Sequence, residues 1–271
     1  MKTILTATIL TLTATGAFAA SHCAAGKTLT DGTLTIATGN PAYYPWVIDD
    51  APEAGQGFEA AVAYALAEEM GFAAENVTWV RTSFDEAIQP GAKDFDLNMQ
   101  QFSITADRDR VVDFSAPYYT APQAVMTTVE AVEGGATPTM DSLKGMKWGV
   151  VASTTALPVV MEKIQPDQSP LVYDDNANIT AAMQAGQIDA ALFDLPTALF
   201  TAAVLMDNGV VLGQFDPSAA ESPDQFGALM LEGSALKPCV DEALAALTDS
   251  GKLAAIEAEW LQDAVGVPLI K

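Results

Sequence analysis

The sequence has few of the side chains that most enzymes use for acid–base and metal chemistry. Its 271 residues include one histidine, His22, two cysteines and three arginines. Transition-metal centres draw most of their ligands from histidine and cysteine, so we expect no metal site. No nucleophile elbow or phosphate-binding loop occurs, and Gly55-x-Gly57-x-x-Ala60 is a weak dinucleotide match because no clear strand precedes it. We therefore expect no cofactor.

Positive charge is also scarce. The chain has 12 basic and 35 acidic residues, which gives a formal net charge of −23. Such a field repels nucleic acid and anionic lipid, so neither is an expected partner. The charge does not by itself predict a cationic ligand, because acidic side chains mostly lie on the solvated surface.

Long hydrophobic runs are missing as well. The longest apolar stretch, 4–15, falls short of the ~20 residues that span a bilayer. It follows a basic start and precedes Ala17-Phe18-Ala19, a small-residue cleavage pattern, so residues 1–19 are predicted to be a secretory signal peptide. Cys23 could instead indicate a lipid anchor, but Ala20-Ser21-His22 is not the usual approach to one. We expect a soluble periplasmic protein.

Short apolar runs alternate with helical stretches along the whole chain. The periodicity predicts strands at 34–37, 77–80, 95–99, 148–151 and 188–193. It predicts helices at 58–70, 156–164, 179–185, 196–206 and 235–261, the last broken near Ser250-Gly251. Strands interleaved with helices favour an α/β fold with mainly parallel sheets, and the alternation over 94–99 predicts a half-buried strand.

The residues that follow this strand are suited to holding a carboxylate. Ser103 and Thr105 offer hydroxyls, and Arg108 or Arg110 offers a planar guanidinium that can bind both carboxylate oxygens. From these residues alone, a solvated charged turn at 107–110 is an equally good interpretation.

The same stretch carries a recognisable motif. Ser-Ile-Thr-x-x-Arg-x-x-x-Val-x-Phe-Ser-x-Pro-Tyr, residues 103–118, resembles periplasmic amino-acid-binding proteins, the receptors of ABC importers (bacterial extracellular solute-binding protein family 3). Four further regions follow in the family's order, namely 34–46 with Gly57-Phe-Glu59, 83–88, 143–155 and 186–194. The resemblance therefore covers nearly the whole mature chain.

The resemblance implies a two-lobed periplasmic-binding-protein fold of type II. Lobe 1 would contain 20–119 plus 220–271 and lobe 2 would contain 120–219, with crossings near 119–123 and 215–225. Paired cysteines in an exported protein usually form disulfides, and both chain ends fall in one lobe of the resembling fold. We therefore predict a Cys23–Cys239 bridge.

The resemblance also assigns the ligand site. Arg108 with Ser103 would hold the ligand's carboxylate, helped by Thr154 and Thr155 at a helix start, whose alternative role is a plain N-cap. Asp194 would pair with the ammonium, and its alternative role is the cap of the next helix.

Tyr43 and Phe84 would sandwich the ligand's side chain. One extra residue in that loop lets Tyr44 replace Tyr43, and Trp46 could line the wall. Gln100 and its neighbour Gln101 stand where basic-residue binders carry small serines, and Gly39-Asn40 stands where they carry an acid, although Glu59 or Asp85 could substitute. A polar ligand side chain is expected.

The sequence thus predicts a monomeric receptor that closes on a polar amino acid by hinge bending and delivers it to an importer permease, without catalysis. Two alternatives stay open. One is an enzyme on the same scaffold, such as a cyclohexadienyl dehydratase-like protein with Glu59 as base. The other is a sensor for a membrane signalling partner.

Overall fold

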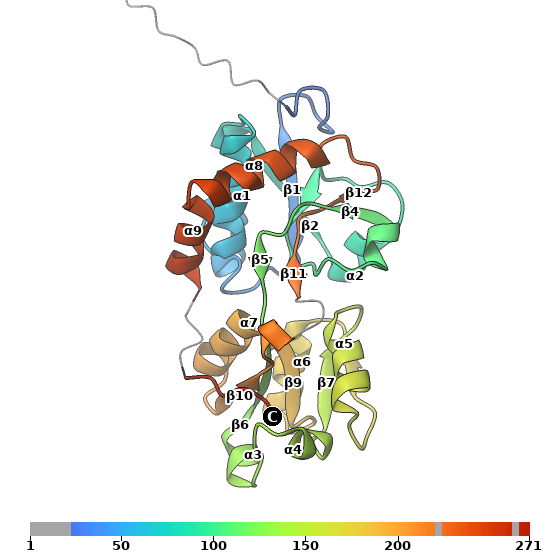
Figure 1. Ribbon diagram of the computed structural model, residues 1–271, viewed down its shortest axis with the longest axis vertical. Helices are drawn as coiled ribbons and strands as arrows, with labels where there is room; N and C mark the ends of the chain where they lie inside the picture. Colours follow the sequence, from blue (N-terminus) through green and yellow to red (C-terminus); the bar gives the residue numbers. More distant parts are fainter. Residues whose placement is uncertain (1–22, 220–223, 262–265) are drawn as a thin grey trace, which may run out of the picture.

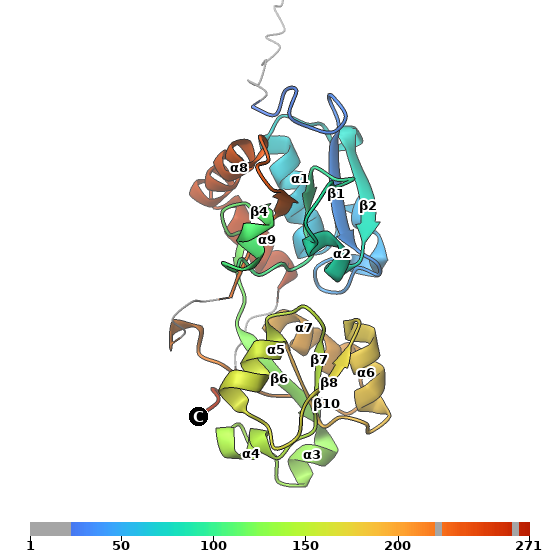
Figure 2. The same ribbon diagram turned by 90° about the vertical axis from the view of Figure 1, so that its right-hand side faces the viewer.

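Two five-stranded sheets, each with its own helices, form two lobes one above the other (Figures 1 and 2). This computed structural model describes residues 23–219, 224–261 and 266–271, so the predicted signal peptide lies outside the described residues. The two-lobed α/β architecture confirms the predicted fold class. No helix in the described ranges is long and apolar enough to cross a membrane.

The first lobe is built on the sheet β2-β1-β3-β12-β4. Its strands are β1 (Leu34–Gly39), β2 (Val77–Thr82), β3 (Leu97–Asn98), β4 (Val112–Phe114) and β12 (Leu229–Leu231), and its helices are α1 (Phe58–Glu69), α2 (Phe84–Ile88), α8 (Lys237–Asp249) and α9 (Lys252–Trp260). α1 contacts both α8 and α9, and one hydrophobic cluster joins these helices to the sheet. The predicted helix at 235–261 is interrupted near Ser250-Gly251, as expected, so α8 ends at Asp249 and α9 begins at Lys252. Gly251 makes the break with a φ of 75°, in the left-handed region that is strained for other residues.

The second lobe is built on the sheet β10-β6-β9-β7-β8, with a hydrophobic cluster on each face. Its strands are β6 (Gln123–Thr128), β7 (Trp148–Val151), β8 (Leu171–Tyr173), β9 (Ala190–Asp194) and β10 (Gly209–Gln214), and its helices are α3 (Val129–Glu133), α4 (Met140–Lys144), α5 (Ala156–Pro158), α6 (Asn176–Gln184) and α7 (Leu195–Phe200). α5 and α7 continue as π-helical segments, Val159–Ile164 and Thr201–Leu205. Short 3₁₀ turns complete the chain at Ile48–Asp50, Pro52–Ala54, Ala74–Asn76, Arg108–Arg110 and Pro217–Ala219.

The sheets are mixed, and the expectation of mainly parallel sheets was wrong. In each lobe two strand pairings are parallel and two are antiparallel. The antiparallel pairings involve β12 in the first lobe and β6 in the second. Each of these strands enters its sheet from the other lobe rather than through a crossover helix, so it runs against its neighbours.

The predicted half-buried strand is buried on both faces. Asp96 and Asn98, on the face expected to meet solvent, are 7% and 0% exposed. The Asp96 carboxylate accepts hydrogen bonds from the backbone N–H groups of Leu29 and Thr35, and the Asn98 amide donates to Thr82 at 2.9 Å. These bonds replace water, so polar residues alternate along a strand that has no solvated face.

The chain passes between the lobes at β5 (Tyr119–Thr120) and β11 (Gln225–Phe226), which pair as a two-stranded antiparallel ribbon between the two large sheets (Figure 1). The last described segment of the chain, 266–271, returns to the second lobe. There Leu269 forms a parallel β-bridge with Gln214 of β10, and the Lys271 N–H donates to the Pro138 carbonyl. The expectation that 220–271 lies wholly in lobe 1 was therefore wrong for these residues. β10 is an edge strand, and this apolar segment covers its unpaired backbone groups.

The predicted disulfide is confirmed. Cys23 and Cys239 are bonded with their Cα atoms 5.5 Å apart, and the bridge ties the start of the described chain to α8. Because the Cys23 sulfur is in this bond, it is not free to carry a lipid.

Candidate functional site

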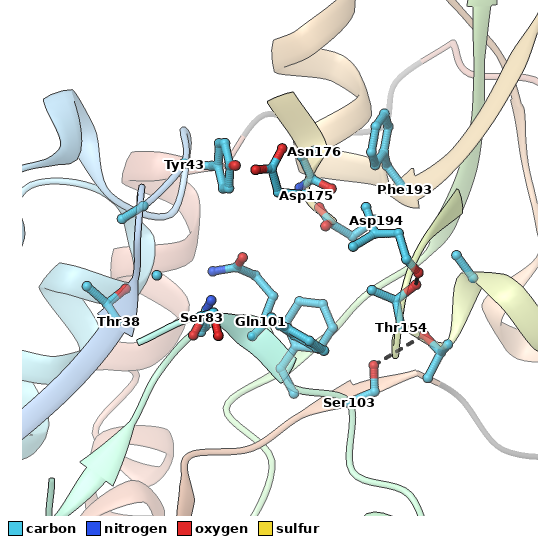
Figure 3. A pocket seen from close by; sticks show the side chains of 18 of the residues that line it. Thr38, Tyr43, Ser83, Gln101, Ser103, Thr154, Asp175, Asn176, Phe193 and Asp194 are labelled. Atoms are coloured by element: carbon cyan, nitrogen blue, oxygen red, sulfur yellow. Dashed lines mark hydrogen bonds between the residues drawn. The ribbon is translucent and has the colours of Figure 1, made fainter. Parts of the chain in front are cut away.

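A cavity of about 240 Å³ lies between the lobes. Figure 3 shows it from close by, with Thr38, Tyr43, Ser83 and Gln101 from the first lobe and Asp175, Asn176, Phe193 and Asp194 from the second. All eight residues that the sequence predicted as ligand contacts line this cavity: Tyr43, Phe84, Gln100, Ser103, Arg108, Thr154, Thr155 and Asp194. The structure therefore brings them together, while their binding role stays a prediction.

Arg108, rather than Arg110, is the arginine of the cavity. Arg110 pairs with Asp107 on the surface, where its side chain is 73% exposed. Arg108 Nη1 donates to the Ser103 carbonyl at 2.7 Å, and Nη2 donates to the Ser153 carbonyl of the second lobe, also at 2.7 Å. Burial lowers the pKa of Arg108, and the charge of Asp224 counteracts this shift. The remaining guanidinium N–H groups can serve a carboxylate.

Hydroxyl groups from both lobes meet beside this guanidinium. Ser103 Oγ lies 3.4 Å from Thr155 Oγ1, and Thr155 donates to Asp224 Oδ2 at 3.1 Å. Thr155 is the first residue before α5, but its side chain makes no capping hydrogen bond, so the plain N-cap interpretation does not describe it. Thr154 Oγ1 donates to the Val151 carbonyl at 2.8 Å.

Asp194 ends β9 and caps α7. Its carboxylate accepts from the Thr197 N–H and the Thr197 hydroxyl, both at 2.8 Å. The capping role is therefore confirmed, and it is compatible with the predicted ammonium-binding role, since each carboxylate oxygen can accept a second hydrogen bond from the cavity. Burial is the main cause that raises the pKa of Asp194 to about 6, and the charge of Asp224 adds to the rise.

The two aromatic residues that the sequence predicted for the cavity wall come from the first lobe, and the second lobe adds Phe193. Phe84 stacks on Phe102 with ring centroids 4.5 Å apart, and the Arg108 guanidinium lies 5.3 Å from the Phe84 centroid. Tyr43 points across the cavity toward Asp175 and Asn176 (Figure 3). Its buried hydroxyl has no hydrogen-bond partner among the described residues, and burial followed by the charge of Asp175 raises its pKa to about 12.

Tyr44 and Trp46 have other roles than the cavity wall. Tyr44 stacks on Phe200 of the second lobe at 4.5 Å with the rings nearly parallel. Trp46, expected as a possible wall residue, is fully buried, and its indole N–H donates to the Thr197 hydroxyl at 2.8 Å. Both aromatics therefore join the lobes and leave the cavity to Tyr43.

Neither substitute acid faces the ligand space. Glu59 is 1% exposed and accepts hydrogen bonds from the Gln101 backbone N–H at 2.7 Å, the Gln101 side-chain amide and the Tyr118 hydroxyl. Burial raises the pKa of Glu59 to about 7 against the opposing effect of these bonds. Asp85 accepts from Ser153 Oγ of the second lobe at 2.6 Å. Glu59 thus orients Gln101, and Asp85 contributes to the contact between lobes.

Sequence reasoning missed five polar residues of the cavity that lie outside the family motifs. These are Asp174 and Asp175 between β8 and α6, Asn176 at the start of α6, Gln123 at the start of β6, and Asp224 before β11. β8 is short and exposed, so its periodicity was not seen; had it been, the loop at its carboxyl end would have been expected at the cleft. Gln123 and Asp224 lay inside the predicted crossings but carried no family motif.

The cavity has an excess of negative groups. Among the lining residues that the structure describes, Arg108 is a cation and four are aspartates: Asp174, Asp175, Asp194 and Asp224. The arrangement can therefore hold a small molecule that has one anionic group for Arg108 and at least one cationic group for the aspartates.

Comparison with known proteins now places the chain. The family model described as bacterial extracellular solute-binding proteins, family 3, matches residues 34–263. The chain belongs to this family. The resemblance seen in the motifs is thereby confirmed, and this solute-binding protein has its interlobe cavity where the motifs predicted one.

Relatives of this solute-binding protein are named as binding proteins. It is 28% identical to the L-cystine-binding protein of Escherichia coli K12 over 206 residues, 75% of this chain and 73% of the relative. It is 28% identical over 237 residues to a putative ABC transporter arginine-binding protein of the same strain, 85% of this chain and 91% of the relative.

Two solved structures show the same fold at slightly lower identity. An ancestral arginine-binding protein bound to glutamine matches with a TM-score of 0.70 at 25% identity, covering 85% of this chain and 98% of the other. An ancestral amino-acid-binding protein described as a precursor of cyclohexadienyl dehydratase matches with a TM-score of 0.68 at 26% identity, covering 85% and 96%.

Proposed function

We propose that this solute-binding protein is a receptor for an amino acid, which it holds between its two lobes. One observation carries the proposal: Arg108 with Ser103 on the first lobe and Asp194 on the second line the same cavity of about 240 Å³. An α-amino acid presents a carboxylate and an ammonium one carbon apart, so it needs a cation and an anion on opposite sides of a small site. The named ligands of the relatives, cystine and arginine, support this class.

Closure of the lobes around the ligand is part of the proposal. The lobes touch through the Trp46–Thr197 hydrogen bond, the Ser153–Asp85 hydrogen bond and the Tyr44–Phe200 ring stack. The ligand adds a contact between Arg108 and Asp194 that neither lobe provides alone. It therefore favours the closed conformation by the free energy of that added contact.

We propose delivery to the permease of an ABC importer, with the receptor acting as a monomer in the periplasm. The names of the relatives support the importer, and the predicted signal peptide supports the location. A sensor role would use the same cavity but a different membrane partner.

A receptor accounts for the site better than an enzyme does. The observation that favours the dehydratase alternative is the similarity to the precursor of cyclohexadienyl dehydratase. Its suggested base, Glu59, is enclosed by Gln101 and Tyr118 and does not line the cavity. A general base must come within hydrogen-bond reach of the proton that it removes, and Glu59 is not so placed.

The test is a thermal-shift screen of the protein from residue 20 onward, because a ligand that binds only the native state raises the melting temperature. The panel contains the twenty amino acids, cystine, polyamines, betaines and prephenate. A shift with one amino acid or a few related ones, followed by titration calorimetry, supports the receptor. A shift with none of the amino acids contradicts it, and release of product from prephenate would support the enzyme.

A further inference from the structure

Asp224 is a charged residue of the cavity that the proposed receptor function leaves unexplained. It lies in the second chain crossing, immediately before β11. Its carbonyl accepts the Ala121 N–H of the first crossing at 2.8 Å, so it joins the two crossings. Its Oδ2 accepts from Gln123 Nε2 at 2.9 Å and from Thr155 Oγ1 at 3.1 Å. Two donors therefore fix the carboxylate in one orientation.

The second carboxylate oxygen of Asp224 has no such donor. Oδ1 is buried and has no hydrogen-bond partner among the described residues, although Asp224 lines the cavity. A buried carboxylate oxygen without a donor is costly, and the cost disappears when a donor reaches it. The ligand space is where such a donor can enter.

Asp224 is linked through Gln123 to the strand that ends at Asp194, and its other donor, Thr155, belongs to the predicted carboxylate end of the site. Gln123, whose amide holds Asp224, is the cross-strand partner of Asp194 in the β6–β9 pairing. The negative charge of Asp224 also acts on both predicted ligand-binding ions, because it adds to the burial that raises the pKa of Asp194 and opposes the burial that lowers the pKa of Arg108. An ammonium group has three N–H donors, enough for two carboxylates at once.

We propose that Asp224 is a second acceptor for the ligand's α-ammonium group, beside Asp194. This inference rests on the proposed function, since it assumes an amino acid in the cavity. It gives the site a specificity that a single aspartate would not: ligands in which a neutral group replaces the ammonium leave two buried carboxylates without a cation and are rejected. The alternative is that Asp224 serves only as a hydrogen-bond acceptor that joins the crossings.

The test compares the parent with Asp224→Asn by titration calorimetry. The probe is whichever of the twenty amino acids and cystine binds the parent most tightly in the thermal-shift screen, together with its 2-hydroxy acid analogue. Asparagine keeps an oxygen for Gln123 and Thr155 but removes the charge. The matched control is Asp216→Asn, which removes a charge from the same connector at a half-buried residue that does not line the cavity.

We expect D224N to weaken binding of the amino acid by at least about tenfold, equivalent to about 1.4 kcal/mol, and to reduce the preference for amino over hydroxy acid by a similar factor. D216N should bind like the parent. The melting temperature of ligand-free D224N should stay close to that of the parent. If D224N does not fold, Asp224→Ser, which also removes the charge, takes its place in the test.

Equal or tighter binding by D224N would overturn the inference, and so would weaker binding with an unchanged preference for the amino acid. Either result would leave the receptor function intact. Failure of the parent to bind any of the twenty amino acids or cystine would instead contradict the proposed function itself, and the inference with it.

Discussion

Replacing Arg108 is the sharpest test of the site. Its side chain lines the cavity, lies over Phe84, and links the Ser103 carbonyl of the first lobe to the Ser153 carbonyl of the second. Arg108→Ala removes the ligand's expected carboxylate partner and this link between the lobes together. Both losses weaken the closed, liganded state more than the open one.

The expected magnitude follows from measured effects of removing one partner of a buried charge pair, which cost about 2 to 5 kcal/mol. At about 1.4 kcal/mol per factor of ten, R108A should weaken binding by roughly 30-fold to several thousand-fold. Arg108→Lys keeps the charge but loses the planar two-point contact, so it should fall between the parent and R108A.

Titration calorimetry with the ligand found in the thermal-shift screen is the assay, and Arg110→Ala is the matched control. Arg110 lies two residues away in the same motif, but it is exposed, pairs with Asp107 and donates to the Ala106 carbonyl, and it does not line the cavity, so its loss should change affinity by less than about twofold. If R108A binds within threefold of the parent, Arg108 does not hold the ligand and the site has been assigned wrongly.

Three further predictions concern other buried groups. Asp194, the proposed partner of the ligand's ammonium, must be ionised to form this pair and has a pKa raised to about 6. Affinity should therefore be constant well above that pH and fall roughly tenfold by about pH 5, where about a tenth of the carboxylate remains ionised; a flat profile in calorimetry over this range would exclude the ion pair. The Cys23–Cys239 bridge closes a separation of 216 residues, so reduction or C23S/C239S should lower the free energy of unfolding by up to about 5 kcal/mol, and denatured protein without reductant should show no titratable thiol. The folded-state pKa of Glu59 is raised from 4.5 to about 7, so the folded state binds this proton more tightly than the unfolded state does. The free energy of unfolding should therefore decrease as pH rises from about 4.5 to 7. The melting temperature of E59Q should fall less over that range than that of the parent.

The sequence predicted the fold and eight of the residues that line the cavity because these residues lie in continuous motifs. Arg108 and Ser103 share one motif, and Asp194 ends a strand whose apolar run is plain. The ends of such strands face the cleft in an open α/β lobe, so their side chains could be placed before any coordinates were known. Residue types and spacing alone left Arg108 and Arg110 as alternatives, the family motif favoured Arg108, and the structure places Arg108 at the cavity and Arg110 on the surface.

What the sequence did not predict depends on contacts between distant segments. Asp224 and Thr155 are 69 residues apart, and Asp175 reaches the cavity only because β8 pairs at the sheet edge. The mixed strand directions and the return of 266–271 to the second lobe also depend on contacts between segments that are distant in the sequence. Local periodicity reports the burial of a segment but not the neighbour against which it is buried.

In the proposed receptor, ligand capture and lobe closure share one short network of hydrogen bonds. The Thr197 hydroxyl donates to Asp194 and accepts the indole N–H of Trp46, a residue of the first lobe. Opening the lobes removes the Trp46 bond from this hydroxyl, and an ionised Asp194 without a cation is held less favourably in its buried site. A ligand ammonium stabilises the ionised carboxylate that orients Thr197, and the oriented hydroxyl in turn offers its lone pair to Trp46. Closure of the cavity is therefore most favourable when the charge inside it is balanced, which is the condition under which a receptor should close.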